Sequence, residues 1–83
     1  MTEPNPWHQL VMTLLGSLIG HPDAVKLKIR EEQRGVVISA EVHPDDVGRV
    51  IGKGGANIAA LRTLVAFVGE QQGISAALDL KNS

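Results

Sequence analysis

The sequence predicts an α+β domain whose elements follow the order α-β-β-α-α-β. Apolar residues recur at helical spacing near the start of the chain, and two later stretches alternate apolar and polar residues as strands do. A run of glycines then divides two further helical patterns. The 83 residues suffice for one small domain, which we assign to residues 1–83 with a core of about 7–80.

The first helix is expected to begin at Pro6, because a first helical turn leaves unpaired the N–H that proline lacks. Its apolar positions lie three or four residues apart, and they are Trp7, Leu10, Val11, Leu14, Leu15 and Leu18. Gly20 and the His21-Pro22 pair are expected to end it, and residues 1–5 to precede it as a frayed end. The stretch is too short to span a membrane, so we expect no membrane contact.

Two strands are then expected to pair as a hairpin. The first has an apolar face of Val25, Leu27 and Ile29 and an opposite face of Lys26, Lys28 and Arg30. The second has an apolar face of Val36, Ile38, Ala40 and Val42. Pairing Ile29 with Ile38 also sets Lys26 against Glu41, an attractive cross-strand pair. We expect the turn at residues 31–35 and the cations on a solvated outer face.

A second helix is expected to open at Pro44, with Asp45 and Asp46 facing the positive end of the helix dipole. Its apolar stripe is Val47, Val50 and Ile51. Glycines 52, 54 and 55 end this helix, and a third helix is expected over about residues 56–68, with a buried face of Ile58, Leu61, Val65 and Val68. Residues 74–80 read as the last strand.

Composition limits the functions that this chain can have. Eight Lys and Arg residues stand against nine Asp and Glu residues, for a net charge of −1, which disfavours charge-driven binding to duplex DNA. Aromatic residues make up only 2%, so the chain has no stacking platform for bases. The absence of cysteine fits a reducing compartment, and we expect a cytoplasmic protein.

The sequence offers no catalytic constellation. No nucleophile lies near a base, and the three histidines show no clustering with acids at ligand spacing. The tripeptides His21-Pro22-Asp23 and His43-Pro44-Asp45 each precede an expected element, so turn and cap chemistry accounts for both. We therefore expect no enzyme activity, no catalytic residue, no metal site and no cofactor.

The most informative stretch is Gly52-Lys53-Gly54-Gly55, between the second and third helices. A Gly-x-x-Gly turn removes Cβ atoms where the backbone of a ligand would approach. The free N–H groups at the start of the third helix add the positive end of its dipole. Lys53 adds a mobile charge, and Arg49 and Arg62 lie on either side in sequence. These residues favour a phosphate site, and a plain turn between packed helices is the alternative.

Other glycine-rich motifs fit less well. A Walker A loop needs four residues before its Gly-Lys pair and a Ser or Thr after it, whereas three residues separate Gly48 from Gly52 and Gly54 follows Lys53. The dinucleotide fingerprint needs a glycine where Asn57 stands. A DNA-binding helix-turn-helix would have only Asn57 and Arg62 as long polar readers.

The same stretch resembles the signature of the KH domain, Val-Ile-Gly-x-x-Gly-x-x-Ile. The specified positions are occupied by Val50, Ile51, Gly52, Gly55 and Ile58. Residues 46–49 and 61–63 are similar to those of the small bacterial single-KH proteins of the KhpA (YlqC) family, and the resemblance extends over about residues 7–80. It implies the type II KH topology, a three-stranded mixed sheet with three helices packed on one face.

The resemblance implies an RNA-binding protein that grips the backbone of single-stranded RNA through its GxxG loop, as an RNA chaperone or post-transcriptional regulator. By position, the glycine loop would hold phosphate, the apolar residues would pack under or along a groove, and the second strand would form its opposite wall. The RNA-binding candidates are Gly52, Lys53, Gly54, Gly55, Arg49, Val50, Ile51, Ile58 and Arg62. Gly54 leaves the loop with one basic side chain, so we expect weak binding with little sequence selectivity. The cations of the first strand could extend the RNA path.

A second hypothesis concerns partners. We expect Trp7 in the core or at an interface rather than as a ligand platform, and so apolar a first helix in so small a domain leaves surface for a partner. The family resemblance implies a homodimer, or a heterodimer with a larger KH-containing protein of the KhpB (Jag) type. The alternative function is therefore a dimerisation or adaptor module in which RNA contact is incidental.

Overall fold

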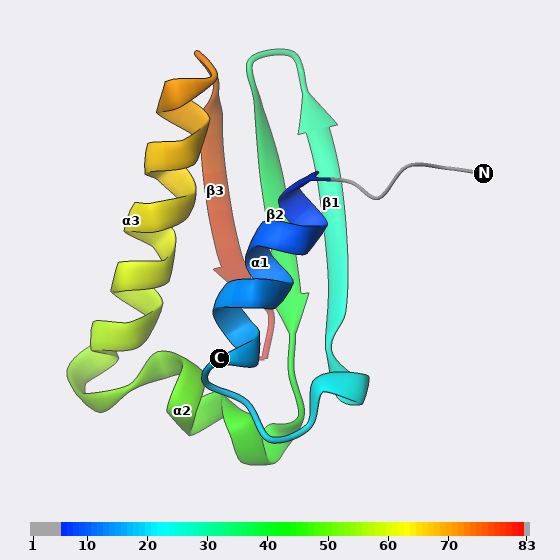
Figure 1. Cartoon of the computed structure of the whole chain (residues 1–83), viewed down its shortest axis with the longest axis vertical. Helices are drawn as coiled ribbons and strands as arrows, with labels where there is room; N and C mark the ends of the chain where they lie inside the picture. The colour runs from blue at the N-terminus through cyan, green and yellow to red at the C-terminus, as the bar shows by residue number, and fades with distance from the viewer. Residues whose placement is uncertain (1–5, 83) are drawn as a thin grey trace.

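The computed structural model describes residues 6–82, so the frayed end expected at residues 1–5 lies outside the described residues. Its elements are α1 (Pro6–Gly16), η1 (Pro22–Ala24), β1 (Lys26–Glu32), β2 (Gly35–Glu41), η2 (Pro44–Asp46), α2 (Val47–Ile51), η3 (Lys53–Gly55), α3 (Ala56–Gln71) and β3 (Ser75–Leu80). α1 crosses in front of the sheet, α3 runs alongside β3, and α2 lies at one end (Figure 1). Apart from the short 3-10 turns, the order of elements confirms the predicted fold class.

The three strands form a mixed sheet in the order β1-β2-β3. β1 and β2 are antiparallel, and the expected register is confirmed, because Ile29 pairs with Ile38 and Lys26 pairs with Glu41. β2 and β3 are parallel. A parallel pair needs a crossover connection, which here consists of α2, the glycine loop and α3. The crossover therefore sets where the glycine loop lies relative to the sheet.

One hydrophobic core joins the helices to a single face of the sheet. Its buried members are Trp7, Val11, Leu15, Val36, Ile38, Ala40, Val42, Val50, Leu61, Val65, Leu78 and Leu80. The alternation in β2 puts every second residue into this core, as predicted. On β1, the cations Lys26, Lys28 and Arg30 are exposed on the opposite face of the sheet. That face lies away from the helices, so these cations do not extend the surface of the crossover.

Apart from the 3-10 turn at Pro44–Asp46, where the second helix was expected to open, three element boundaries differ from expectation by more than one residue. α1 ends at Gly16 rather than at Gly20, because the N–H groups of Leu18 and Ile19 both donate to Leu15 O, at 2.8 and 3.1 Å. Both side chains still pack on the core, which explains why the apolar pattern continues beyond the helix. The hairpin turn is also shorter than residues 31–35, because β1 continues to Glu32 and pairs there with Gly35.

The third difference is at the end of α3, which continues to Gln71 through a buried Gly69. A Cβ at Gly69 would lie 2.7 Å from the Cβ of Ala76 on β3. The glycine therefore permits close approach of the helix to the strand rather than ending the helix. The sequence pattern gave no sign of this contact, since it depends on a neighbour across the fold.

Among residues 6–82, Asp46 is the one buried polar residue, with 1% of its surface exposed. Its carboxylate accepts hydrogen bonds from Gly20 N at 3.0 Å, His21 N at 3.0 Å and His21 Nδ1 at 3.2 Å. The Gly20 N–H lowers the pKa of this carboxyl most, and the contacts with His21 lower it further against the opposing effect of burial. Asp46 is the N-cap residue of α2, at the end of the helix where an acid was expected, and its carboxylate also ties the loop after α1 to the start of α2.

Truncation of Ile38 tests the position of the core. Ile38 is fully buried at the centre of the sheet, so Ile38→Ala should lower the free energy of unfolding by about 2–5 kcal/mol. The neighbouring Val37 points to the outer face, and Val37→Ala should cost clearly less. Urea unfolding followed by circular dichroism measures both variants. Equal losses would contradict the assignment of faces in β2.

Candidate nucleic-acid interface

The glycine loop depends on a backbone conformation that other residues rarely adopt. Gly52, Gly54 and Gly55 have φ values of 76°, 62° and 79°. Side chains with a Cβ disfavour this left-handed region. Among residues 6–82, positive φ values occur only at glycines, so Lys53 keeps a common conformation between them. The loop closes with a hydrogen bond from Gly55 N to Gly52 O at 3.1 Å.

The glycines of the loop differ in their surroundings. A Cβ at Gly52 would lie 2.6 Å from Cγ of Asn57, so packing and φ both require glycine there. At Gly54 and Gly55 a Cβ would meet no atom of the described residues within 4 Å. At these two positions only the positive φ requires glycine, and the space where a Cβ would lie is open. This is where the sequence predicted that the backbone of a ligand would approach.

Asn57 holds the loop from beneath, and it was not among the predicted site residues. Its Nδ2 donates to Arg49 O at 2.7 Å, which satisfies a carbonyl in the last turn of α2. Gly52 N donates to Gly48 O at 2.8 Å in the same turn. Asn57 therefore links the end of α2 to the start of α3. The sequence feature that could have identified it is an Asn in the first turn of a helix next to glycines, because its side chain can hydrogen-bond to the nearby backbone.

The N-terminus of α3 follows directly on the 3-10 turn η3, in which Gly55 N donates to Gly52 O and Ala56 N donates to Lys53 O. Gly55 occupies its N-cap position, and among the described residues no side chain caps it. The first N–H groups of a helix carry partial positive charge and favour an anion. Lys53 is exposed within the loop and adds a full charge. Together these groups can bind a phosphate by main-chain approach and one cation.

The structure brings the two arginines of the predicted site to different places. Arg62 Nε donates to Leu78 O at 3.1 Å, so this side chain joins α3 to β3. Arg49 is exposed on α2, and its Nη1 would lie 3.5 Å from a Cβ at Gly20, which places the guanidinium against the loop after α1. Arg62 thus belongs to the surface between α3 and β3, whereas Arg49 lies next to Asp46 and the α1–β1 loop.

The apolar candidates support the loop to different degrees. Val50 is fully buried, so it packs beneath the loop and cannot itself contact a ligand. Ile51 and Ile58 are half-buried and pack against the core. These two side chains therefore form the apolar surface next to the glycines.

β2 does not form the wall that the sequence suggested. It is the middle strand, paired on both edges, and its inner face is filled by the core. The strand beside α3 is β3, at the edge of the sheet (Figure 1). The candidate interface therefore runs from the glycine loop along α3 and β3, where Arg62 bridges the two elements.

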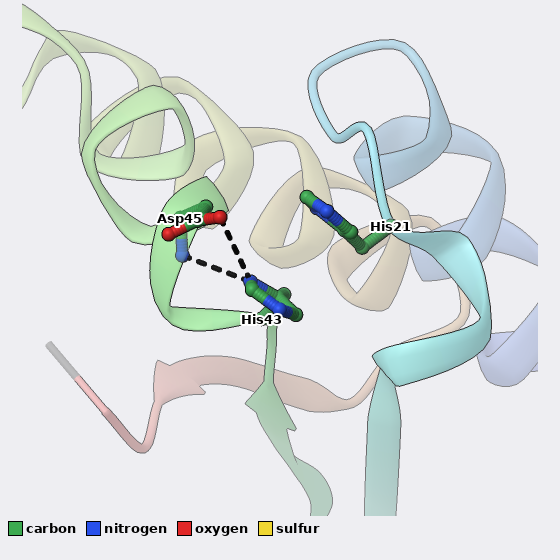
Figure 2. A group of neighbouring side chains, drawn as sticks. All are labelled: His21, His43 and Asp45. Carbon is green, nitrogen blue, oxygen red and sulfur yellow. Dashed lines mark hydrogen bonds and ion pairs between the residues drawn. The ribbon is translucent and has the colours of Figure 1, made fainter.

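The expectation that the histidines do not cluster with acids is wrong. The rings of His21 and His43 stack with centroids 3.9 Å apart and planes at 14°. His43 Nδ1 accepts from Asp45 N at 3.1 Å and lies 3.7 Å from Asp45 Oδ2 (Figure 2). The fold thus joins residues that are 22 positions apart, which local spacing could not indicate.

Within residues 6–82, none of the helices is long and apolar enough to cross a membrane.

Comparison with known proteins gives a consistent family. The sequence model of the KhpA/KhpB KH domain matches residues 8–80. Proteins named "RNA-binding protein KhpA" from Mycobacterium tuberculosis and Streptomyces coelicolor are 45% and 43% identical to this chain over 56 residues. These stretches cover 68% of this chain and 70% and 71% of those proteins. A protein of the same name from Oceanobacillus iheyensis is 43% identical over 56 residues, which cover 68% of this chain and 75% of that protein. Comparison with solved structures gives no significant match.

Alanine substitution distinguishes the two kinds of glycine in the loop. Gly54→Ala should cost about 1–2 kcal/mol of stability, because only the left-handed backbone opposes it. Gly52→Ala should cost more, because the new Cβ also collides with Asn57. Urea unfolding of both variants gives the comparison. A Gly52 variant as stable as the Gly54 variant would show that the Asn57 contact is absent in solution.

Proposed function

The chain belongs to the KhpA/KhpB family of KH domains, and on this premise we propose that it binds single-stranded RNA, gripping the RNA backbone at Gly52–Gly55. The observation that carries the proposal is the open space at Gly54 and Gly55 beside an uncapped helix N-terminus. The relatives named for RNA binding support it. RNA bound in this way would serve an RNA chaperone or a post-transcriptional regulator in the cytoplasm.

The geometry supports different contacts along the interface, with the RNA phosphate at the glycine loop and the bases at α3 and β3. A phosphate approaches the main chain of Gly54 and Gly55, where no Cβ intervenes, and the start of α3 stabilises its charge. Lys53 adds an ionic contact from within the loop. The following bases lie over the outer surface of α3 and β3, which pack against each other, next to the half-buried Ile58 and towards Arg62. Because Arg62 keeps its Nε on Leu78 O, its terminal nitrogens can reach the RNA without losing that anchor.

Binding by this surface should be weak and tolerant of sequence. Main-chain donors and a single lysine read the backbone, which is the same for every base. The net charge of −1 provides no long-range attraction for RNA. High affinity would then require a second RNA-binding domain, supplied by another copy or by a larger KH-containing protein of the KhpB (Jag) type.

Charge reversal in the loop tests the grip. Lys53→Asp with Gly54→Asp puts two carboxylates where phosphate binds, and should lower RNA affinity roughly tenfold or more. Lys53→Asn with Gly54→Asn is the matched control, because Asn has the same shape without the charge and tolerates positive φ. Fluorescence anisotropy with a short single-stranded RNA of mixed sequence measures both. Unchanged affinity in the folded Asp variant would refute the grip and favour the adaptor hypothesis.

Salt dependence provides a separate test. If about two or three phosphates are neutralised, the logarithm of the binding constant should fall against the logarithm of salt with a slope of about −1.5 to −2. The same RNA titrated at several KCl concentrations gives the slope. A much steeper slope would mean that cations beyond the glycine loop, such as those of β1, carry the binding.

One observation favours the alternative function as a dimerisation module. Leu64 and Phe67 on α3 expose 47% and 56% of their surface, and both are large apolar side chains. They lie one helical turn apart and share a face with Ala60. Burial of such a stripe is favourable, and two antiparallel copies of α3 would cover each other. We take a second copy of the chain as the occupant of this face.

Substitution of Phe67 tests the dimer. Phe67→Arg should convert a dimer into a monomer in sedimentation velocity, because it places two cations within the shared apolar stripe. Gln9→Arg, at an exposed position on α1, is the control and should not change the oligomeric state. A wild-type chain that sediments as a monomer at high concentration would leave this face to a different partner.

A further inference from the structure

Two loops that are far apart in sequence bring three metal-ligating side chains together. His21 lies in the loop after α1, whereas His43 and Asp45 lie between β2 and α2 (Figure 2). Their candidate ligand atoms, two imidazole nitrogens and one carboxylate oxygen, all lie within 4.8 Å of one another. Each histidine precedes a proline that begins a one-turn helix, η1 or η2, which fixes the local backbone.

Asp46 sets the tautomer of His21 before an ion binds. The buried carboxylate is an acceptor, so the 3.2 Å contact with Nδ1 requires the proton on that nitrogen. In the neutral ring the lone pair is then on Nε2. His21 also remains accessible, since 45% of its side chain is exposed.

His43 and Asp45 form a second half of the site. His43 Nδ1 accepts the N–H of Asp45, so this nitrogen is unprotonated and carries its lone pair. Asp45 Oδ2 lies 3.7 Å from the same nitrogen. An ion with bonds of about 2.0–2.2 Å to nitrogen and oxygen can contact two atoms at this separation. The ion would take the place of the N–H as the partner of Nδ1.

The stacked arrangement needs one adjustment. An ion lies in the plane of each imidazole that binds it, and two rings at 14° and 3.9 Å share no such position. One ring must therefore turn out of the stack on binding. His21 can do so at the surface, where its ring gives up the contact with Asp46, whereas His43 is held next to Asp45 by the turn. This requirement lowers the affinity and leaves the ligand set unchanged.

From these contacts we propose that His21, His43 and Asp45 bind a transition-metal ion of the zinc class. Two nitrogens and one carboxylate oxygen suit Zn²⁺, Co²⁺ or Ni²⁺, whereas Mg²⁺ and Ca²⁺ prefer oxygen ligands alone. Three protein ligands leave a fourth position for water. The ion would join the loop after α1 to the start of α2 and so restrain the helix that precedes the glycine loop. The proposal does not rest on RNA binding.

Titration of the whole chain with ZnCl₂ tests the proposal, and His8 provides a matched control. His8 is exposed on α1, so His8→Gln should bind zinc as the wild type does. His21→Gln and His43→Gln should each lower the affinity at least tenfold in calorimetry. CoCl₂ should give the visible absorption of a four-coordinate nitrogen and oxygen site, and MgCl₂ should give no saturable binding.

A measurement on the wild type avoids any loss of fold in the variants. Histidine ring ¹⁵N spectra recorded during the zinc titration should show shifts of His21 and His43 and an unchanged His8. Absence of saturable zinc binding, equal shifts in all three histidines, or zinc affinity retained by the folded His21→Gln/His43→Gln double variant would each overturn the proposal.

Discussion

The carboxylate of Asp46 holds together the end of the fold on which the glycine loop depends. It accepts the N–H groups of Gly20 and His21 and the ring N–H of His21, so a buried charge has three donors. Without it, two main-chain donors in a part-buried loop would lose their partner, and α2 would lose its link to the α1–β1 loop. α2 is only five residues long and cannot hold its position by itself.

The position of α2 then determines the backbone path of the glycine loop. Val50 anchors the short helix in the core, and Asn57 joins its last turn to α3. Between these two anchors the chain must turn within four residues, and three positive-φ glycines make that turn possible. This backbone path lets a phosphate approach the main chain near the positive end of the α3 dipole. Binding therefore does not depend on many cationic side chains. A protein of net charge −1 can bind a polyanion in this way, with the salt dependence of few contacts.

The sequence predicted what depends on local periodicity. The alternation in β1 and β2 defined their faces and their register, because a shift of one residue would turn Ile38 out of the core. The glycine signature located the loop, because glycines at these spacings mark a backbone that other residues oppose. The predicted ends of α1 and α3 were less accurate. The end of α1 depends on hydrogen bonds to Leu15 O, and the end of α3 depends on the contact of the helix with Ala76 on β3.

Features that depend on distant contacts could not be read from the chain. Asp46 resembled an ordinary helix-opening acid, and only the fold shows that Gly20 and His21, more than twenty residues earlier, are its partners. The pairing of His21 with His43 has the same origin. The wall of the interface was assigned to the second strand, whereas the crossover brings the edge strand β3 beside α3. In each case the missing information was which segments lie side by side.

The most direct test of the RNA grip is an amide NMR titration of the whole chain with a short single-stranded RNA. If the glycine loop holds the RNA backbone, the largest shifts will occur at residues 52–58, followed by Arg62 and the neighbouring part of β3. Shifts confined to Leu64 and Phe67, or to the outer face of the sheet, with an unchanged loop would contradict this grip.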